Sequence, residues 1–166
     1  MASWSDFAAA EPSLAAGIRA LLQQYGPGMA YLATVRADGG PRIHPASPVF
    51  TDEGLYCFIV NSPKRRDLER DGRYALHSYP PEENDDEAYL AGRAVRVRDP
   101  LVVASLSGSL HASPDVDWHL YELLIDTATL RHHGPVGALP LAAPPLVRPK
   151  ARTWRSELSR PLAAAS

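Results

Sequence analysis

Three cations stand directly after a Ser-Pro pair, in the run Ser62, Pro63, Lys64, Arg65 and Arg66. Serine is a favourable N-cap and proline suits the first helical position, so the run is predicted to open a short helix. The unpaired N–H groups and the dipole at a helix N-terminus favour an anion, whereas each cation placed there costs about 0.3–1 kcal/mol. A bound phosphate would offset that cost. The run therefore indicates either a phosphate site or a solvated basic turn balanced by the carboxylates that follow it.

Strand signals precede this run closely. Met29–Arg36 and Leu55–Val60 are rich in β-forming residues, and the second is almost continuously apolar, as expected of a buried strand. Pro41–Phe50 is predicted to be extended, and the Asp-Gly-Gly sequence just before it supplies a hairpin turn. These three segments are therefore predicted to form an antiparallel meander that ends where the basic run begins.

The remaining elements follow from hydrophobic periodicity and turn residues. We predict helices over 11–25, 63–70 and 100–110, strands over 74–79, 88–98 and 119–130, and a last strand or edge segment over 151–156. About six strands, with one helix before the first and another after the third, predict a mainly β fold: a β-barrel with capping helices. We expect one domain, 1–166, in which 29–98 form the core barrel and 134–166 an extended Pro-rich segment.

Composition narrows the classes of function. The chain has 166 residues, of which 45% are hydrophobic and 22% charged, as is typical of a globular protein. A formal net charge of −2 argues against a broad nucleic-acid surface. We expect no membrane association and a cytoplasmic location, because no apolar run approaches about 20 residues and the N-terminus lacks a signal-peptide pattern. The histidines match no zinc spacing, the acidic run 82–87 is interpreted as a solvated loop without calcium-ligand spacing, and Cys57 is interpreted as a buried apolar residue.

The order of the motifs resembles that of the flavin-binding split-barrel family that includes pyridoxamine 5′-phosphate oxidase. The matching pieces are LATVRADGGP over 32–41, PASPV over 45–49, DEGLY over 52–56, and then Ser62, Lys64, Leu68, Arg73, Ala75 and Leu76. The resemblance covers residues 14–98 and is weak after residue 100. It implies a split β-barrel of the FMN-binding type, paired as a homodimer with the cofactor at the subunit interface.

The resemblance also implies which residues contact the cofactor. In chain order they are Arg42, His44, Pro45, Ala46, Ser47, Ile59, Val60, Ser62, Lys64 and Arg65. The arginine at the head of this series is expected near the cofactor, and the next four residues along its ring system. The Ile-Val pair is expected to face the ring and the ribityl chain, and the last three residues to hold the phosphate. Arg66 is expected to pair with a neighbouring carboxylate.

The activity implied by the resemblance is that of an oxidoreductase in which hydride passes between FMN and a small-molecule substrate. The deazaflavin coenzyme F-420 is the alternative cofactor, because that branch of the family also carries a lysine at the position of Lys64. A non-catalytic protein that carries or senses a flavin or a haem is a further alternative. Vitamin B6 oxidation itself is not expected, because the family's R-x-H motif is missing near Trp154. No general acid or base is assigned, and His44 is the best candidate because histidine titrates near neutral pH.

Overall fold

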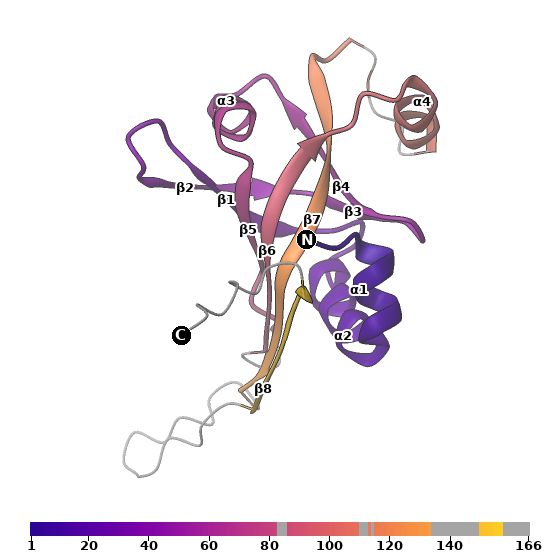
Figure 1. Ribbon diagram of the computed structural model, residues 1–166, viewed down its shortest axis with the longest axis vertical. Helices are drawn as coiled ribbons and strands as arrows, with labels where there is room; N and C mark the ends of the chain where they lie inside the picture. The colour runs from indigo at the N-terminus through magenta and orange to yellow at the C-terminus, as the bar shows by residue number, and fades with distance from the viewer. Residues whose placement is uncertain (83–85, 110–112, 114, 134–149, 158–166) are drawn as a thin grey trace, which may run out of the picture.

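A single curled sheet dominates the computed structural model, which describes residues 1–82, 86–109, 113, 115–133 and 150–157. Within these residues eight antiparallel strands are joined in the order β2-β1-β5-β6-β7-β4-β3, with β8 paired to β7 (Figure 1). The strands are β1 (Ala30–Val35), β2 (Pro41–Ala46), β3 (Pro48–Phe50), β4 (Leu55–Val60), β5 (Arg73–Ser78), β6 (Glu87–Arg96), β7 (Trp118–His132) and β8 (Lys150–Arg155). The predicted mainly β architecture is confirmed. Of the Pro-rich segment expected over 134–166, residues 134–149 and 158–166 lie outside the described part.

One bent segment supplies both ends of the sheet. The extended stretch predicted over Pro41–Phe50 is divided at Ser47 into β2, which pairs with β1, and β3, which pairs with β4. Pro45 and Pro48, which lack a backbone N–H, lie on either side of this division and weaken regular pairing there. Because β2 and β3 are consecutive in the chain but lie at opposite ends of the strand order, the sheet must curl into a half-barrel.

Four helices accompany the sheet in the described part of the chain: α1 (Trp4–Ala10), α2 (Pro12–Gln23), α3 (Pro63–Arg70) and α4 (Pro100–Ser109). The first two pack side by side against the sheet, whereas α3 and α4 lie toward its other end (Figure 1). The sequence patterns predicted the last three helices but not α1. A capping box marks its start, because the Ser3 hydroxyl accepts the N–H of Asp6 and the Asp6 carboxylate accepts the N–H of Ser3. Among the described residues, no helix combines the length and apolar character needed to cross a membrane.

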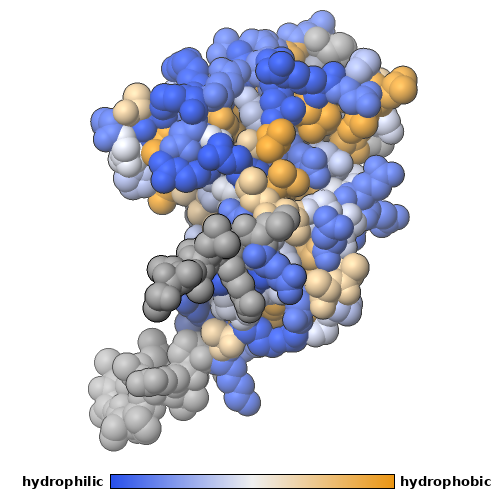
Figure 2. All heavy atoms as spheres, viewed as in Figure 1, coloured by the Kyte–Doolittle hydropathy of each residue, from blue (hydrophilic) through white to orange (hydrophobic). Residues whose placement is uncertain are grey.

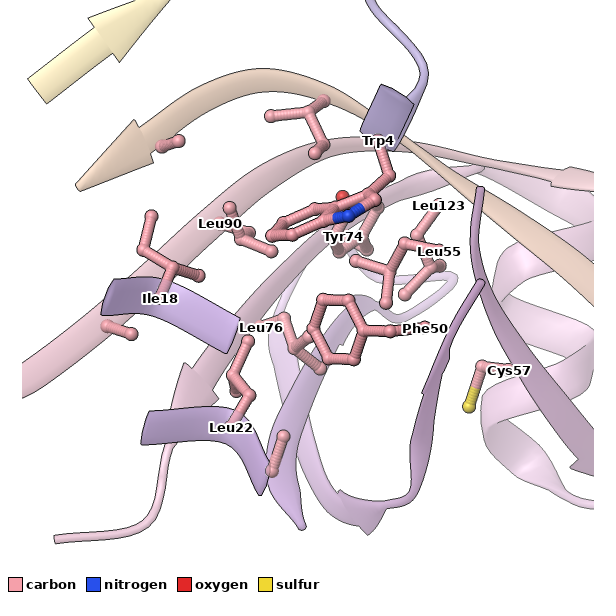
Figure 3. Packing of buried hydrophobic residues seen from close by; sticks show 14 of the residues in the cluster. Trp4, Ile18, Leu22, Phe50, Leu55, Cys57, Tyr74, Leu76, Leu90 and Leu123 are labelled. Carbon is pink, nitrogen blue, oxygen red and sulfur yellow. The ribbon is translucent and has the colours of Figure 1, made fainter. Parts of the chain in front are cut away.

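The core fills the space between the concave side of the sheet and the first two helices. Trp4 of α1 meets Phe50 of β3 edge to face, with ring centroids 4.7 Å apart, beside Leu76 from the middle of the sheet (Figure 3). Each large apolar side chain buried in this way contributes about 1.5–3 kcal/mol relative to exposure. Cys57 belongs to the same cluster, and burial raises the pKa of its thiol to about 11, as expected of a structural cysteine.

A β-bulge interrupts the pairing of the two longest strands. Ala91 of β6 faces Thr127 of β7, but the next residue, Gly92, faces Ile125, so Asp126 is skipped. A Cβ atom on Gly92 would lie 2.0 Å from the carbonyl oxygen of Leu124. Only glycine fits this close approach, and the shift re-aims the last residues of β6 toward α3 and α4.

Candidate functional site

The predicted helix over 63–70 is present with the same bounds, and it crosses one end of the half-barrel (Figure 1). Ser62 occupies the N-cap position, as its sequence predicts, but its side chain makes no capping hydrogen bond. The hydroxyl instead turns back and donates to the carbonyl oxygen of Val60 at 2.9 Å. The helix start therefore lacks the side-chain acceptor that normally satisfies its N–H groups.

Strand β2 and the start of α3 bring three basic side chains together, and we call Arg42, His44 and Lys64 the basic cradle. Lys64 reaches from α3 to β2, where its Nζ donates to the carbonyl oxygen of Pro45 at 3.0 Å. His44 is half-buried on β2, and its Nε2 is buried with no hydrogen-bond partner among the described residues. Burial lowers the pKa of His44, and the positive charges of Lys64 and Arg42 lower it further, so this imidazole is neutral at neutral pH.

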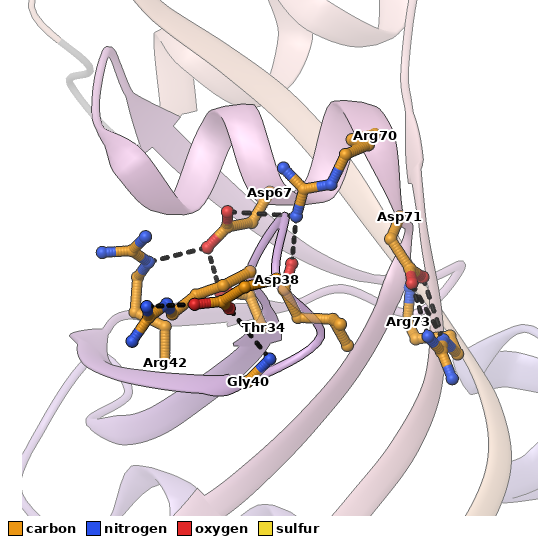
Figure 4. Close-up of polar contacts among 10 residues, drawn as sticks. Thr34, Asp38, Gly40, Arg42, Asp67, Arg70, Asp71 and Arg73 are labelled. Carbon is orange, nitrogen blue, oxygen red and sulfur yellow. Dashed lines mark hydrogen bonds and ion pairs between the residues drawn. The ribbon is translucent and has the colours of Figure 1, made fainter.

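A buried carboxylate holds Arg42 in place. The Asp67 Oδ2 atom accepts from Arg42 Nε at 2.7 Å and from Thr34 Oγ1 at 3.0 Å, and its Oδ1 accepts from Arg70 at 3.3 Å (Figure 4). Burial by itself raises the pKa of Asp67, but these three hydrogen bonds outweigh it and lower the pKa below its ordinary value. Arg42 uses Nε for this bond, so its two terminal amino groups have no hydrogen bond to any described residue and remain available to a ligand.

Of the two arginines that follow Lys64, Arg65 is the one paired with a carboxylate. Arg65 is buried and donates two parallel hydrogen bonds to the Asp117 carboxylate, at 2.8 and 2.9 Å, just before β7. This pairing lowers the pKa of Asp117. Arg66 is exposed and forms no ion pair within the described part of the chain, although we expected it to be the paired one. Arg65 therefore ties α3 to β7, and its guanidinium is already engaged.

Comparisons with known proteins identify the fold. No protein-family model matches the chain, and no curated protein matches it. Solved structures do match. The heme storage protein HutZ from Vibrio cholerae matches with a TM-score of 0.52 and 21% identity over 70% of this chain and 89% of its own, and an F420 reductase with a TM-score of 0.51 and 20% identity over 64% of this chain and 91% of its own. PhzG from Burkholderia lata 383, in complex with tetrahydrophenazine-1-carboxylic acid, matches with a TM-score of 0.53 and 16% identity over 76% of this chain and 79% of its own. The chain has the split-barrel fold.

The residues expected along the cofactor ring do not share one surface of the split barrel. Side chains alternate along β4, so Ile59 is buried in the core while Val60 is 45% exposed. Similarly, His44 and Ala46 of β2 lie on its half-buried face, whereas Pro45 is exposed on the opposite face, and Ser47 is exposed at the bend. Because successive side chains of a strand point to opposite faces of the sheet, this division between two faces could have been predicted from the sequence.

A histidine-carboxylate cluster at the far end of the sheet corrects the interpretation of 82–87 as a solvated loop at its last residue, Glu87, whereas 83–85 lie outside the described residues. Glu87 begins β6, and its carboxylate contacts His77 Nε2 at 3.0 Å, Arg131 at 2.7 Å and His133 Nε2 at 3.4 Å. Burial raises its pKa, but these contacts outweigh burial and bring the pKa of Glu87 down to about 2. The cluster joins β5, β6 and β7 in the split barrel.

We expect Glu87 to make folding pH-dependent. Its folded pKa of about 2 lies below the ordinary 4.5, so its stabilisation is fully present above pH 4.5 and is lost as the pH falls toward 2. Glu87→Gln should lower the free energy of unfolding by about 2 kcal/mol at pH 7, allowing for partial exposure of its partners. Denaturant titrations between pH 7 and 2 should show this difference shrinking below pH 4.5. Glu82→Gln, at an exposed neighbouring position, is the control; a difference independent of pH would contradict the assignment.

Proposed function

We propose that the chain binds FMN at the basic cradle and is an oxidoreductase that transfers hydride to or from a small-molecule substrate. The observation that carries the proposal is the convergence of Lys64, Arg42 and the unpartnered buried Nε2 of His44 at the start of α3. A phosphate group forms strong hydrogen bonds with accessible cations that do not yet have a full set of partners. The split-barrel fold supports the proposal, because the similar structures include an F420 reductase and a heme storage protein.

Each residue of the site has a distinct task in this proposal. Lys64 releases its bond to the Pro45 carbonyl and binds the phosphate together with Ser62 and the terminal amino groups of Arg42. The backbone N–H of Lys64 joins them, whereas those of Arg65 and Arg66 already donate to the Ser62 carbonyl oxygen. Arg65 acts as a positioning residue that holds the helix against β7. Neutral His44 offers a hydrogen bond to the phosphate from β2. When bound, the flavin supplies the hydride chemistry, and the protein orients it and excludes water.

An absorption spectrum tests the proposal directly. Protein purified with bound cofactor, or loaded by titration, should show the two visible bands of an oxidised flavin, and FMN should raise the melting temperature in proportion to its affinity. A single deazaflavin band or preferential stabilisation by F-420 would replace FMN by the alternative cofactor while keeping the phosphate site. A Soret band with no FMN binding would favour a haem carrier. Absence of binding to all three would overturn the proposal.

We further propose that the chain forms a homodimer through the outer face of its sheet. Small and apolar residues form a row across four strands on this face, where Ile43, Ala33, Ala75 and Ala91 are register neighbours. Ile43 is 66% exposed, which is unusual for an isoleucine in the middle of a strand. Sedimentation equilibrium should give twice the 18.0 kDa chain mass. A monomer that still binds FMN tightly would contradict the dimer without contradicting the cofactor.

A further inference from the structure

A groove runs along the end of β6, with residues of α3 lining one part and residues of α4 lining the other. Two adjoining cavities form it, with volumes of about 440 Å³ next to α3 and about 560 Å³ next to α4. Arg96 and Arg98 line both cavities, so the two are adjacent. Volumes of about 300–1,000 Å³ are typical of small-molecule sites. The groove lies on the β6 and β7 side of α3, whereas the basic cradle lies on the β1 and β2 side.

The half of the groove next to α3 is strongly basic. Four arginines line it: Arg70, Arg93, Arg96 and Arg98. The last three form no ion pair with any residue that the structure describes. Glu69 is the acidic residue of the lining, and its carboxylate already lies 3.1 Å from His119 Nδ1 and 4.0 Å from Arg65 Nε. Unpaired guanidinium groups in one concave surface favour an anion with several oxygens.

Tyr121 lines the same cavity, and its buried hydroxyl has no partner among the described residues. Tyr121 is 1% exposed, and its hydroxyl makes no hydrogen bond within the described part of the chain. It lies opposite Arg96 in the register of β6 and β7. A buried hydroxyl left unsatisfied is costly, so its retention at the wall of an arginine-lined cavity points to a ligand oxygen as the missing partner.

The half of the groove next to α4 has an apolar wall. Its lining residues include Val97, Pro100, Val103, Trp118 and Leu120. The space-filling view shows the same trend on the face it presents, with hydrophilic side chains around α3 and apolar side chains toward α4 (Figure 2). The groove thus has a charged end for an anion and an apolar end for a ring or chain.

We propose that this groove is a second binding site, for an organic phosphate such as a nucleoside diphosphate. The phosphate groups lie among Arg93, Arg96 and Arg98 and accept the hydrogen bond of the Tyr121 hydroxyl. The apolar body of the ligand lies against Trp118 and its neighbours. This site is separate from the proposed FMN cradle and does not depend on it.

Calorimetric titration of the full chain with pyrophosphate and with ADP tests the site. Both probes should bind, and ADP should bind more tightly because it also covers the apolar wall and changes Trp118 fluorescence. The Arg96→Ala, Arg98→Ala double variant should weaken both probes about 100-fold, and Tyr121→Phe about tenfold, if each lost contact is a charge-assisted hydrogen bond. Arg155→Ala, which removes one exposed arginine from β8, is the matched control and should change affinity less than about twofold.

The outcomes distinguish binding in the groove from binding in the basic cradle. Failure of both probes to bind overturns the proposal, as does binding that the arginine variant leaves unchanged. If Lys64→Ala abolishes ADP binding while the groove variant does not, the probe occupies the cradle and the groove site is refuted. If ADP binds no more tightly than pyrophosphate, the apolar wall has no role and the organic part of the proposal fails. Tyr121→Phe has a second readout, because removing an unsatisfied hydroxyl should raise the melting temperature of the unliganded protein.

Discussion

Replacing Arg42 and Lys64 together by alanine is expected to weaken FMN binding by about 3 kcal/mol or more, at least a hundredfold. Each side chain contributes one charge-assisted hydrogen bond to the phosphate in the proposed site, at about 1.5–3 kcal/mol each. The measurement is FMN affinity from quenching of flavin fluorescence, together with a melting curve. Folding should survive, because Thr34 and Arg70 still donate to Asp67 when Arg42 is absent.

Arg66→Ala provides the matched control for this experiment. It removes the same charge from the same helical turn. Arg66 lines a cavity together with Arg42, but its side chain is exposed and forms no ion pair with any described residue. We expect less than about a threefold loss of affinity, which reports only the long-range field of the charge. A loss as large as that of Lys64→Ala would place the phosphate on the outer side of α3 and contradict the cradle.

Gly92→Ala should lower the free energy of unfolding by about 3 kcal/mol or more, the upper end of the range for overpacking. The new Cβ would lie 2.0 Å from the Leu124 carbonyl oxygen and 3.0 Å from the Asp126 amide nitrogen. Both are backbone atoms in the ladder of β6 and β7, so neither can swing aside as a flexible side chain does. Urea unfolding at constant protein concentration measures the change.

Gly108→Ala is the same substitution where space is open. Nothing lies within 4 Å of the Cβ that would be added there, in the last turn of α4. Alanine is favoured over glycine in a helix by about 1 kcal/mol, so this variant should be neutral or more stable. If Gly92→Ala proves equally harmless, the bulge between Gly92 and Leu124 does not have the described geometry.

Local signals in the sequence predicted much of the fold. Three of these signals each occupy only a few residues: the Ser-Pro start of α3, the apolar run of β4 and the Gly-rich hairpin before β2. All three elements lie where they were expected. The capping box of Ser3 and Asp6 was equally local, so α1 could have been predicted from the same kind of signal.

Which charged residues pair with one another in the candidate site could not be predicted in the same way. Whether Arg65 or Arg66 is paired depends on which side of α3 faces Asp117, 52 residues further along the chain. The partners of Asp67 on β1 and β2 are likewise 33 and 25 residues away. Such contacts depend on how the strands and the helix pack together, and short-range sequence patterns carry no information about which distant residues meet.

The bend at Ser47 has a consequence for association between molecules. Among the described strands β2 and β3 are the outermost two, and each pairs on one side, so each keeps a row of N–H and C=O groups that can recruit a strand from another molecule. Here a single uninterrupted piece of backbone turns from one end of the strand order to the other. Proteolytic cleavage between Ala46 and Pro48 would break that continuity and let the two sheet edges move apart. Aggregation of the nicked protein, followed by light scattering, is the expected result.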